Sequence, residues 1–392
     1  MKVLVSDGME ESGVDYFRQN GIEIDLRRKT LEILLGCIGE YDGLIVRSST
    51  NVDRNLVYRG AEGNLKVIGR AGVGYDNIDV DAATEKGIVV KFAPYGNTES
   101  TAELAFGLML AVSRNIPQAH YSLRNGVWRR KPFSGSELSH KTIGIIGCGR
   151  VGQRLSEIVM GMDMETIGYD INPSLNSHIT YLPKDEVLAN SDFVSLHVNS
   201  NGVVIGEREI AMMKPSAYLI NTSRGCVLDE EALYQALLDK RIAGVALDVF
   251  SSEPKEDGEF SNKFASLENV VLTPHLGAST SESQARTSLE IARVVSGFLL
   301  RGSFENSVNI GETLDSEQRK VYPIFIYHKD IPGAFATIDQ ILADSGVNIR
   351  ETPSRQIGKQ GNVISVYLVH DEITDEMIRR IESLPIVYRI SK

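Results

Sequence analysis

The chain has 392 residues, 42% of them hydrophobic, and a formal net charge of −11 at pH 7. That length can hold two or three domains, and the acidic balance argues against a nucleic-acid or anionic-membrane partner, because such partners require a basic face. The three cysteines are widely spaced, and no signal peptide, membrane-spanning run or metal-ligand cluster is apparent. We therefore expect a cytoplasmic protein without disulfides, a membrane anchor or a metal.

Residues 1 to about 95 alternate short apolar runs with stretches that are long enough for crossover helices. The runs are Lys2–Ser6, Ile22–Leu26, Leu44–Val46, Lys66–Ile68 and Ile88–Phe92. Continuous apolar runs are typical of parallel strands, because these strands are buried on both faces of their sheet. The pattern predicts one doubly wound parallel-sheet lobe.

A second series of strands and helices begins at Thr142, after a long apolar helix that the capping-box pattern Ser100-Thr-Ala-Glu103 is expected to start. Its strands are predicted at Thr142–Ile146, Thr166–Tyr169, Phe193–Val198, Ala217–Thr222, Val245–Val249 and Val270–Thr273. A helix over Thr280–Leu300 is placed to cross back to the first lobe. The polar stretch Gly302–Lys320 has little periodicity and predicts a linker.

The rest of the chain predicts a small module of its own. Strands are expected at Val321–Tyr327, Asn348–Glu351, Val363–Val369 and Ile386–Ile390, with helices at Ala334–Asp344 and Thr374–Ser383. The order β-α-β-β-α-β is that of a ferredoxin-like fold. Because the module contains no candidate nucleophile, base or metal set, we interpret it as a binding or assembly unit.

The clearest chemical signal is a dinucleotide fingerprint, which runs Gly147-Cys-Gly149-Arg150-Val151-Gly152 between a predicted strand and a helix. Its glycines allow a tight turn, a close approach of the backbone to a pyrophosphate, and packing of the helix on the strand. The pyrophosphate is then held by free N–H groups at the start of the helix. Asp170 ends the next strand, about 20 positions on, where a carboxylate accepts from the ribose of NAD and repels the 2′-phosphate of NADP.

Other polar residues stand where strands of the second lobe end, which is where open α/β sheets bind ligands. His275 is the best general base, since a neutral imidazole accepts a hydroxyl proton near neutral pH. Glu253 could fix the tautomer of that ring, or it could be a solvated loop acid. Arg224 suits a substrate carboxylate, and Asp248 could accept from the nicotinamide amide. His197 is as easily structural as functional.

Two strand ends of the first lobe also carry candidate binding groups. Arg47 and Ser48 follow one strand, and Arg70 precedes Gly72-Val73-Gly74 at the end of another. The Gly72–Gly74 loop lacks the third glycine of the fingerprint, so we do not interpret it as a nucleotide loop. Its bare N–H groups could cradle a carboxylate instead. Arg47 could bind a second anionic group or be a solvent-exposed arginine.

Over residues 1–310 these motifs together resemble the NAD-dependent D-isomer-specific 2-hydroxyacid dehydrogenases. The motifs that carry the resemblance are Gly69–Asp79, Gly147–Gly152, Asn221–Gly225, Ala246–Phe250 and Thr273–Thr280. The resemblance implies that His275, Glu253 and Arg224 are catalytic and that Asp170 and Asp248 contact NAD. We also expect cofactor contacts from Thr101, His197 and Thr222, and a substrate contact from Asn97.

The same resemblance implies the domain layout. We expect a discontinuous, flavodoxin-like substrate-binding domain at 1–97 and 278–310, a Rossmann NAD-binding domain at 98–277, and a linker at 311–320. Residues 321–392 resemble an ACT domain, the module that binds small amino acids, on the patterns His328–Gly333 and Gly346–Asn348. The candidate effector contacts are His328, Asp330 and Asn348.

A dehydrogenase of this family with an ACT domain is expected to oxidise 3-phospho-D-glycerate at C2, the first step of L-serine synthesis. Arg47 then matches the position that holds the substrate phosphate or carboxylate. The alternatives are another 2-hydroxyacid, such as hydroxypyruvate, glyoxylate or 2-oxoglutarate, and a non-catalytic NADH sensor. We expect a homodimer or homotetramer, with L-serine or another small amino acid as the ligand of the ACT domain.

Overall fold

The computed structural model describes residues 1–392 except 175–177, 201, 255–257, 311–321, 358–360 and 372. Its internal contacts divide the chain into two units, Met1–Gly96 with Gln284–Lys392, and Asn97–Ser283. Among the described residues, no helix combines the length and the apolar character needed to cross a bilayer.

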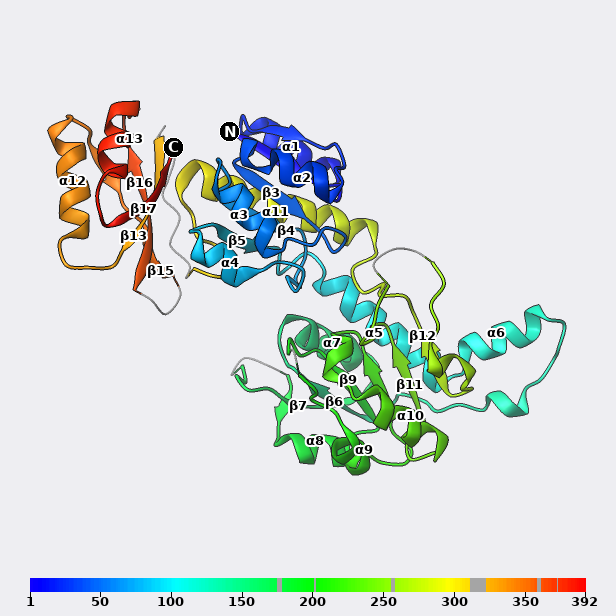
Figure 1. The fold of residues 1–392 in the computed structure, drawn as a ribbon. Helices are drawn as coiled ribbons and strands as arrows, with labels where there is room; N and C mark the ends of the chain where they lie inside the picture. Colours follow the sequence, from blue (N-terminus) through cyan, green and yellow to red (C-terminus); the bar gives the residue numbers. More distant parts are fainter. Residues whose placement is uncertain (175–177, 201, 255–257, 311–321, 358–360, 372) are drawn as a thin grey trace. The chain divides into compact units, whose positions relative to one another are not determined.

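The first unit opens with a parallel five-stranded sheet in the order β2-β1-β3-β4-β5, the flavodoxin-like order (Figure 1). The strands are β1 Lys2–Val5, β2 Glu23–Asp25, β3 Gly43–Val46, β4 Val67–Arg70 and β5 Val89–Phe92. The helices are α1 Glu11–Gln19, α2 Leu31–Cys37, α3 Arg54–Ala61, α4 Val80–Glu85 and the long α11 Ser281–Arg301. Buried apolar side chains on both faces of the sheet form its core, as its apolar runs predict.

The second unit holds a parallel seven-stranded sheet in the order β12-β11-β10-β9-β6-β7-β8. Its strands are β6 Thr142–Ile146, β7 Glu165–Tyr169, β8 Thr180–Tyr181, β9 Phe193–Leu196, β10 Tyr218–Asn221, β11 Gly244–Leu247 and β12 Val270–Leu272. Its helices are α5 Thr98–Ser113, α6 Ile116–Arg124, α7 Arg150–Met160, α8 Lys184–Asn190, α9 Glu207–Met212 and α10 Glu230–Leu238. The order reverses beside β6, the switch point at which Rossmann sheets bind nucleotides.

The C-terminal part of the first unit is an antiparallel sheet in the order β14-β16-β13-β17, with β15 also paired to β16. Its elements are β13 Tyr322–Lys329, α12 Ala334–Asp344, β14 Ile349–Glu351, β15 Ser354–Ile357, β16 Asn362–Val369, α13 Asp375–Glu382 and β17 Val387–Ser391. Two parallel-sheet lobes and a C-terminal ferredoxin-like sheet therefore confirm the predicted fold class. The domain boundaries, including the linker at 311–320 outside the described residues, stay predictions.

The central strands of this antiparallel sheet carry buried side chains on both faces, and the side chains of β13 alternate between the two faces. Ile324 and Ile326 pack with the helices α12 and α13, whereas Phe325 and Tyr327 join the core of the first lobe. The ring centroids of Phe325 and Phe298 lie 5.0 Å apart. The sheet thus contacts the lobe in the same unit through an apolar face.

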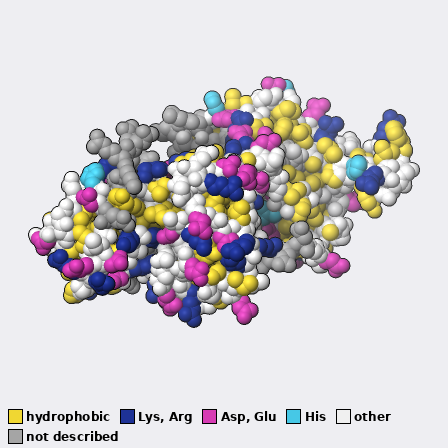
Figure 2. Space-filling view, turned by 90° about the horizontal axis from the view of Figure 1, so that it is seen from above, with side chains coloured by type: hydrophobic (Ala, Val, Ile, Leu, Met, Phe, Trp, Pro, Cys, Tyr) yellow, Lys and Arg dark blue, Asp and Glu magenta, His cyan; other side chains and the backbone are white. Residues whose placement is uncertain are grey.

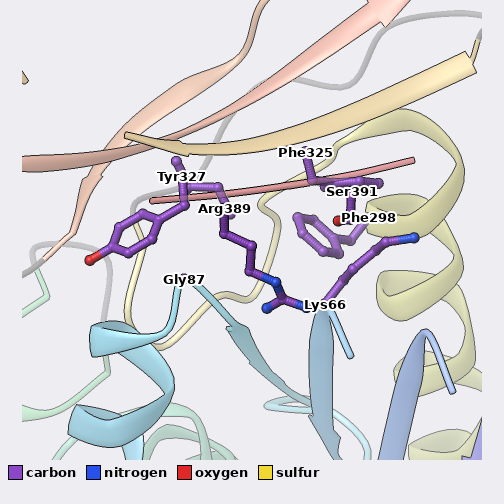
Figure 3. A pocket seen from close by; sticks show the side chains of 8 residues that line it. Lys66, Gly87, Phe298, Phe325, Tyr327, Arg389 and Ser391 are labelled. Carbon is purple, nitrogen blue, oxygen red and sulfur yellow. The ribbon is translucent and has the colours of Figure 1, made fainter. Parts of the chain in front are cut away.

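Charged groups complete that contact (Figure 3). Arg389 on β17 donates to the carbonyl oxygens of Gly63 at 3.1 Å and Leu65 at 2.7 Å. Burial lowers the pKa of Arg389 to about 10. Lys66 donates to Asp42 Oδ1 at 2.8 Å, and the cavity that Lys66 and Arg389 line has a volume of about 10 Å³, enough for about one water.

Two local predictions are wrong. Helix α5 begins at Thr98 with Asn97 as its N-cap, and Ser100 Oγ hydrogen-bonds Thr280 Oγ1 at 2.6 Å instead of capping the helix. The stretch from Gly302 is no loose linker up to residue 310. Phe304 is fully buried, and Val308 N donates to Val90 O at 2.8 Å, so this polar stretch packs along β5.

Candidate active site

The fingerprint has the local geometry that a dinucleotide needs. Gly147 has φ +94°, and Gly152 lies so close to it that a Cβ there would meet Gly147 O at 2.4 Å. Gly149 is the N-cap of α7, and a Cβ built on it would meet nothing within 4 Å. The backbone at Gly149 is therefore open beside the N-terminus of a helix, which fits a pyrophosphate. Arg150 and Val151 begin that helix.

Asp170 stands at the end of β7 and is already held in place. Its Oδ2 accepts from Cys148 N at 2.7 Å, and its Oδ1 accepts from Asn172 N at 2.8 Å. Each carboxylate oxygen has a further lone pair, so the group can still accept from a ribose hydroxyl. These residues fit NAD, and the acidic group disfavours the 2′-phosphate of NADP.

His275 and Glu253 are brought together although 22 positions separate them. The ring Nδ1 of His275 donates to Glu253 Oε2 at 2.6 Å, and Phe250 N donates to Glu253 Oε1 at 3.0 Å. This bond raises the pKa of His275 against the opposing effect of burial. Burial acts to raise the pKa of Glu253, but the bonds from His275 and Phe250 outweigh it and lower that pKa. An ionised Glu253 therefore leaves Nε2 of His275 as the proton-accepting nitrogen.

Arg224 lies near this pair, and its charge acts to lower the pKa of both groups, which for His275 only partly offsets the rise caused by Glu253. The loop that carries Arg224 is shaped by Asn221, which is fully buried at the end of β10 and donates to Arg224 O at 2.9 Å. Gly225 follows, and a Cβ there would lie 1.9 Å from the backbone of Phe250. The glycine thus lets the arginine loop pack directly on the segment that leads to Glu253.

Asp248 has a role that the sequence did not suggest. It is fully buried, and its Oδ1 accepts from Thr273 Oγ1 at 2.6 Å and from Leu276 N at 2.7 Å. Its Oδ2 accepts from Gly277 N at 2.9 Å. These bonds fix the loop around His275, whose φ of +53° requires such support. The predicted contact of Asp248 with the nicotinamide stays a prediction beside this positioning role.

The remaining predicted cofactor residues differ in their surroundings. Thr101 Oγ1 donates to Gly277 O at 3.1 Å, so it ties α5 to the same loop. His197 shares a hydrogen bond of 2.8 Å between its Nε2 and Ser195 Oγ, and burial lowers its pKa to about 4. Among the described residues, the buried Thr222 Oγ1 has no hydrogen-bond partner. Thr222 is therefore a polar group that a ligand could satisfy.

In the first unit, Arg47 stands out because it is half-buried without an ion pair to any described residue. Its Nε has no partner among those residues, and Nη2 reaches only Ser288 Oγ at 3.5 Å. Burial lowers the pKa of Arg47, although Glu10 and Asp7 act to raise it. A cation in this state is suited to an anionic ligand. The adjacent Ser48 is exposed.

The second substrate loop is built around Arg70. Its Nη1 donates to Ala71 O at 2.9 Å, and a Cβ on Gly72, where φ is +153°, would lie 1.8 Å from that same nitrogen. Val73 and Gly74 continue the loop. Asn97, in the other unit, has a buried Oδ1 with no hydrogen-bond partner in the described part of the chain. Substrate contacts by these residues stay predictions.

The three candidate effector contacts do not form one open site within the C-terminal sheet. His328 is fully buried, and its ring nitrogens contact Lys329 O at 2.9 Å and Ser365 Oγ at 2.8 Å. Asp330 accepts from Gln356 Nε2 at 2.9 Å, whereas Asn348 is exposed. Their role as ligand contacts stays a prediction, and His328 needs to leave Ser365 to serve it.

Comparisons with known proteins identify the family to which this chain is similar. Residues 106–277 match the family described as D-isomer specific 2-hydroxyacid dehydrogenase, NAD binding domain. A D-3-phosphoglycerate dehydrogenase of Archaeoglobus fulgidus is 40% identical over 320 residues, which are 79% of this chain and 59% of that protein. A hydroxypyruvate reductase of Thermotoga maritima is 41% identical over 300 residues, which are 75% of this chain and 97% of that protein.

A solved structure is similar over the same share of the chain. The TT0316 protein from Thermus thermophilus superposes with a TM-score of 0.71 at 30% identity, covering 79% of this chain and 100% of that one. The chain spans 58–63% of the length of the first three curated relatives. With the NAD-binding domain matched and one relative covered almost from end to end, the chain belongs to the D-isomer-specific 2-hydroxyacid dehydrogenases.

Proposed function

We propose that this protein oxidises 3-phospho-D-glycerate to 3-phosphohydroxypyruvate with NAD, the first step of L-serine synthesis. The observation that carries the proposal is the half-buried Arg47 guanidinium without an ion pair to any described residue. This substrate has two anionic groups, and the chain offers Arg47 for the phosphate besides Arg224 for the carboxylate. Several curated relatives at about 40% identity are named D-3-phosphoglycerate dehydrogenases.

In this proposal His275 Nε2 takes the proton of the C2 hydroxyl as the C2–H bond breaks, and the C2–O bond becomes a carbonyl. Glu253 holds the ring in the required tautomer and stabilises the imidazolium that forms. Arg224 binds the carboxylate and withdraws electron density from the developing carbonyl. NAD, when bound, supplies the hydride acceptor. The fingerprint glycines, Asp170 and Thr222 are the residues that would hold it.

A substrate panel followed through NADH absorbance tests the proposal, with Arg47→Ala as the deciding variant. Loss of a charge-assisted contact of about 1.5–3 kcal/mol should raise KM for 3-phosphoglycerate by about 10- to 100-fold. KM for glyoxylate, which has no phosphate, should change by less than about threefold. Arg59→Ala is the matched control, because Arg59 is exposed and pairs only with Glu62 in the described structure. Equal effects on both substrates would contradict the proposal.

A second candidate is a dehydrogenase or reductase for another 2-hydroxyacid, such as hydroxypyruvate, glyoxylate or 2-oxoglutarate. The hydroxypyruvate reductase that this chain covers almost entirely favours it. Higher kcat/KM for one of these acids in the same panel would select this reading. A non-catalytic NADH sensor is the least favoured, because it would not require His275, Glu253 and Arg224 together. NADH binding by calorimetry without turnover of any acid would support it.

We also propose that the protein is a homodimer or homotetramer that associates through the second unit. Large apolar side chains are exposed on α6 and just after it, namely Ile116, Tyr121, Leu123, Val127 and Trp128. Figure 2 shows hydrophobic and basic side chains side by side at its right-hand end, where this segment lies. A patch of this composition suits a second copy of the chain. Sedimentation of Tyr121→Asp should give a smaller species than the wild type.

For the C-terminal sheet we propose regulation by L-serine or another small amino acid, bound near Asp330 and Asn348. A serine titration that changes kcat or the melting temperature supports it, and no change in either leaves assembly as the role of this sheet. We place the enzyme in the cytoplasm, because Cys37, Cys148 and Cys226 are all free thiols.

A further inference from the structure

The loop that carries Arg47 has no regular secondary structure, yet four of its polar backbone groups and one hydroxyl are bound by side chains from elsewhere. Asp7, which follows β1, accepts from Arg47 N at 2.7 Å and Thr50 N at 3.0 Å through Oδ2. Its Oδ1 accepts from Thr50 Oγ1 at 2.6 Å. One carboxylate thus grips both ends of the four-residue segment from Arg47 to Thr50.

Asn77 binds the carbonyl groups of the same segment, whereas Asp7 binds its N–H groups. Its Nδ2 donates to Arg47 O at 2.7 Å and to Thr50 O at 2.6 Å, which uses both of its N–H groups. Asn77 belongs to the stretch that begins with the Gly72–Gly74 loop. Backbone bonds from Val52 N to Asn77 O at 2.8 Å and from Asp79 N to Val52 O at 2.9 Å keep the two stretches together.

We propose that Asp7 and Asn77 are positioning residues that orient the Arg47 guanidinium toward the substrate phosphate; this rests on the proposed function. Their combined contacts, named here the Asp7–Asn77 clamp, fix the backbone on both sides of Arg47. Among the described residues, the Arg47 side chain makes a single long hydrogen bond, to Ser288, so its direction depends on that backbone. The clamp also couples the two loops that carry the predicted substrate contacts. A cationic side chain held through its backbone keeps its orientation without forming an ion pair with a carboxylate of the protein.

The first test is steady-state kinetics of Asp7→Ala and Asn77→Ala with the full-length protein. Each should raise KM for 3-phosphoglycerate by about 10-fold, with kcat and KM for glyoxylate almost unchanged, because the charge of Arg47 remains but its position is lost. Asp7→Asn should restore most of the affinity, since an amide oxygen can still accept from both backbone N–H groups. Asp53→Ala is the matched control, because within the described structure the Asp53 side chain accepts one hydrogen bond, from Leu56 N at 2.9 Å.

A double-mutant cycle separates positioning from general damage. If Asp7 acts through Arg47, the double variant D7A/R47A should have the same KM for 3-phosphoglycerate as Arg47→Ala alone. Additive effects of the two substitutions, or equal rises of KM for both substrates, would overturn the proposal.

Amide hydrogen exchange gives a readout that does not depend on the substrate. In the wild type the N–H groups of Arg47 and Thr50 should be protected, and in Asp7→Ala they should exchange about 10- to 100-fold faster, with the rest of the sheet unchanged. Unchanged exchange in a folded Asp7→Ala overturns the clamp. If the wild type turns over only acids without phosphate, the proposed function fails, whereas exchange at these two groups still decides whether the clamp exists.

Discussion

The His275 site and the Arg47 site treat their charged groups in opposite ways. His275 Nδ1 and Glu253 Oε2 form a hydrogen bond of 2.6 Å, and each side chain shifts the pKa of the other. Arg47 is held mainly through its backbone, and its guanidinium has one long hydrogen bond to Ser288 and no ion pair to a described residue. A group that must exchange a proton needs a permanent partner to set its tautomer and pKa. A cation that must bind an anionic ligand works best when no carboxylate of the protein forms an ion pair with it.

Among the substitutions that test this comparison, we expect the largest effect, a loss of kcat, from the replacement of His275. His275→Ala removes the general base and should lower kcat by about 10²- to 10⁴-fold, while NAD binding and the melting temperature stay close to those of the wild type. His178→Ala is the control, because His178 is exposed. Unchanged turnover in His275→Ala, measured under saturating substrate, would remove this residue from the mechanism.

A smaller effect is expected from Glu253→Gln, and it appears in the pH profile. The bond from Glu253 raises the pKa of His275, and a base works only when neutral, so kcat/KM for oxidation falls as the pH falls through that pKa. Without the carboxylate the pKa drops, and the acidic limb of the profile should move to lower pH while the plateau decreases. Glu231→Gln, which breaks only the exposed contacts with Lys263 and Gln235, should not move the limb. A limb at the same pH in both variants would show that the two groups are not coupled in solution.

The smallest expected effect is a change in the free energy of unfolding, which tests whether the charge of Arg47 contributes to the stability of the fold. Arg47→Met keeps most of the side-chain volume and removes a half-buried cation, so the free energy of unfolding should rise by up to about 1 kcal/mol. Thermal unfolding in the absence of substrate measures this change, with Arg59→Met as the surface control. A loss of stability of similar size would mean that the guanidinium supports the fold, and the contrast between the two sites would disappear.

Features that depend on local pattern were predicted closely. The fingerprint, the strand ends and the helix over 334–344 follow from the residues at those positions, because turns, apolar runs and glycine conformations are decided over a few neighbours. Predictions failed where partners are distant. Ser100 fits a cap by its spacing to Glu103, but it bonds Thr280. The polar run from Gly302 is anchored by the buried Phe304 and by the backbone bond from Val308 N to Val90 O. The short strands Thr180–Tyr181 and Ser354–Ile357 were not predicted from the sequence. Each is defined by its hydrogen bonds to a longer neighbouring strand, and a local sequence pattern does not show these.

The sequence by itself determined that this chain has a dinucleotide-binding lobe, a second parallel-sheet lobe and a ferredoxin-like C-terminal sheet, and that an imidazole and two arginines stand at strand ends. Only the tertiary structure decided what those side chains touch. In the folded chain Glu253 binds His275, and Asp248 holds the loop that carries this base. Asp7 and Asn77 bind the Arg47 loop, while the guanidinium has no ion pair to a described residue. The reason is that contacts across 20 to 40 positions depend on the order and register of the strands, and no local pattern encodes these.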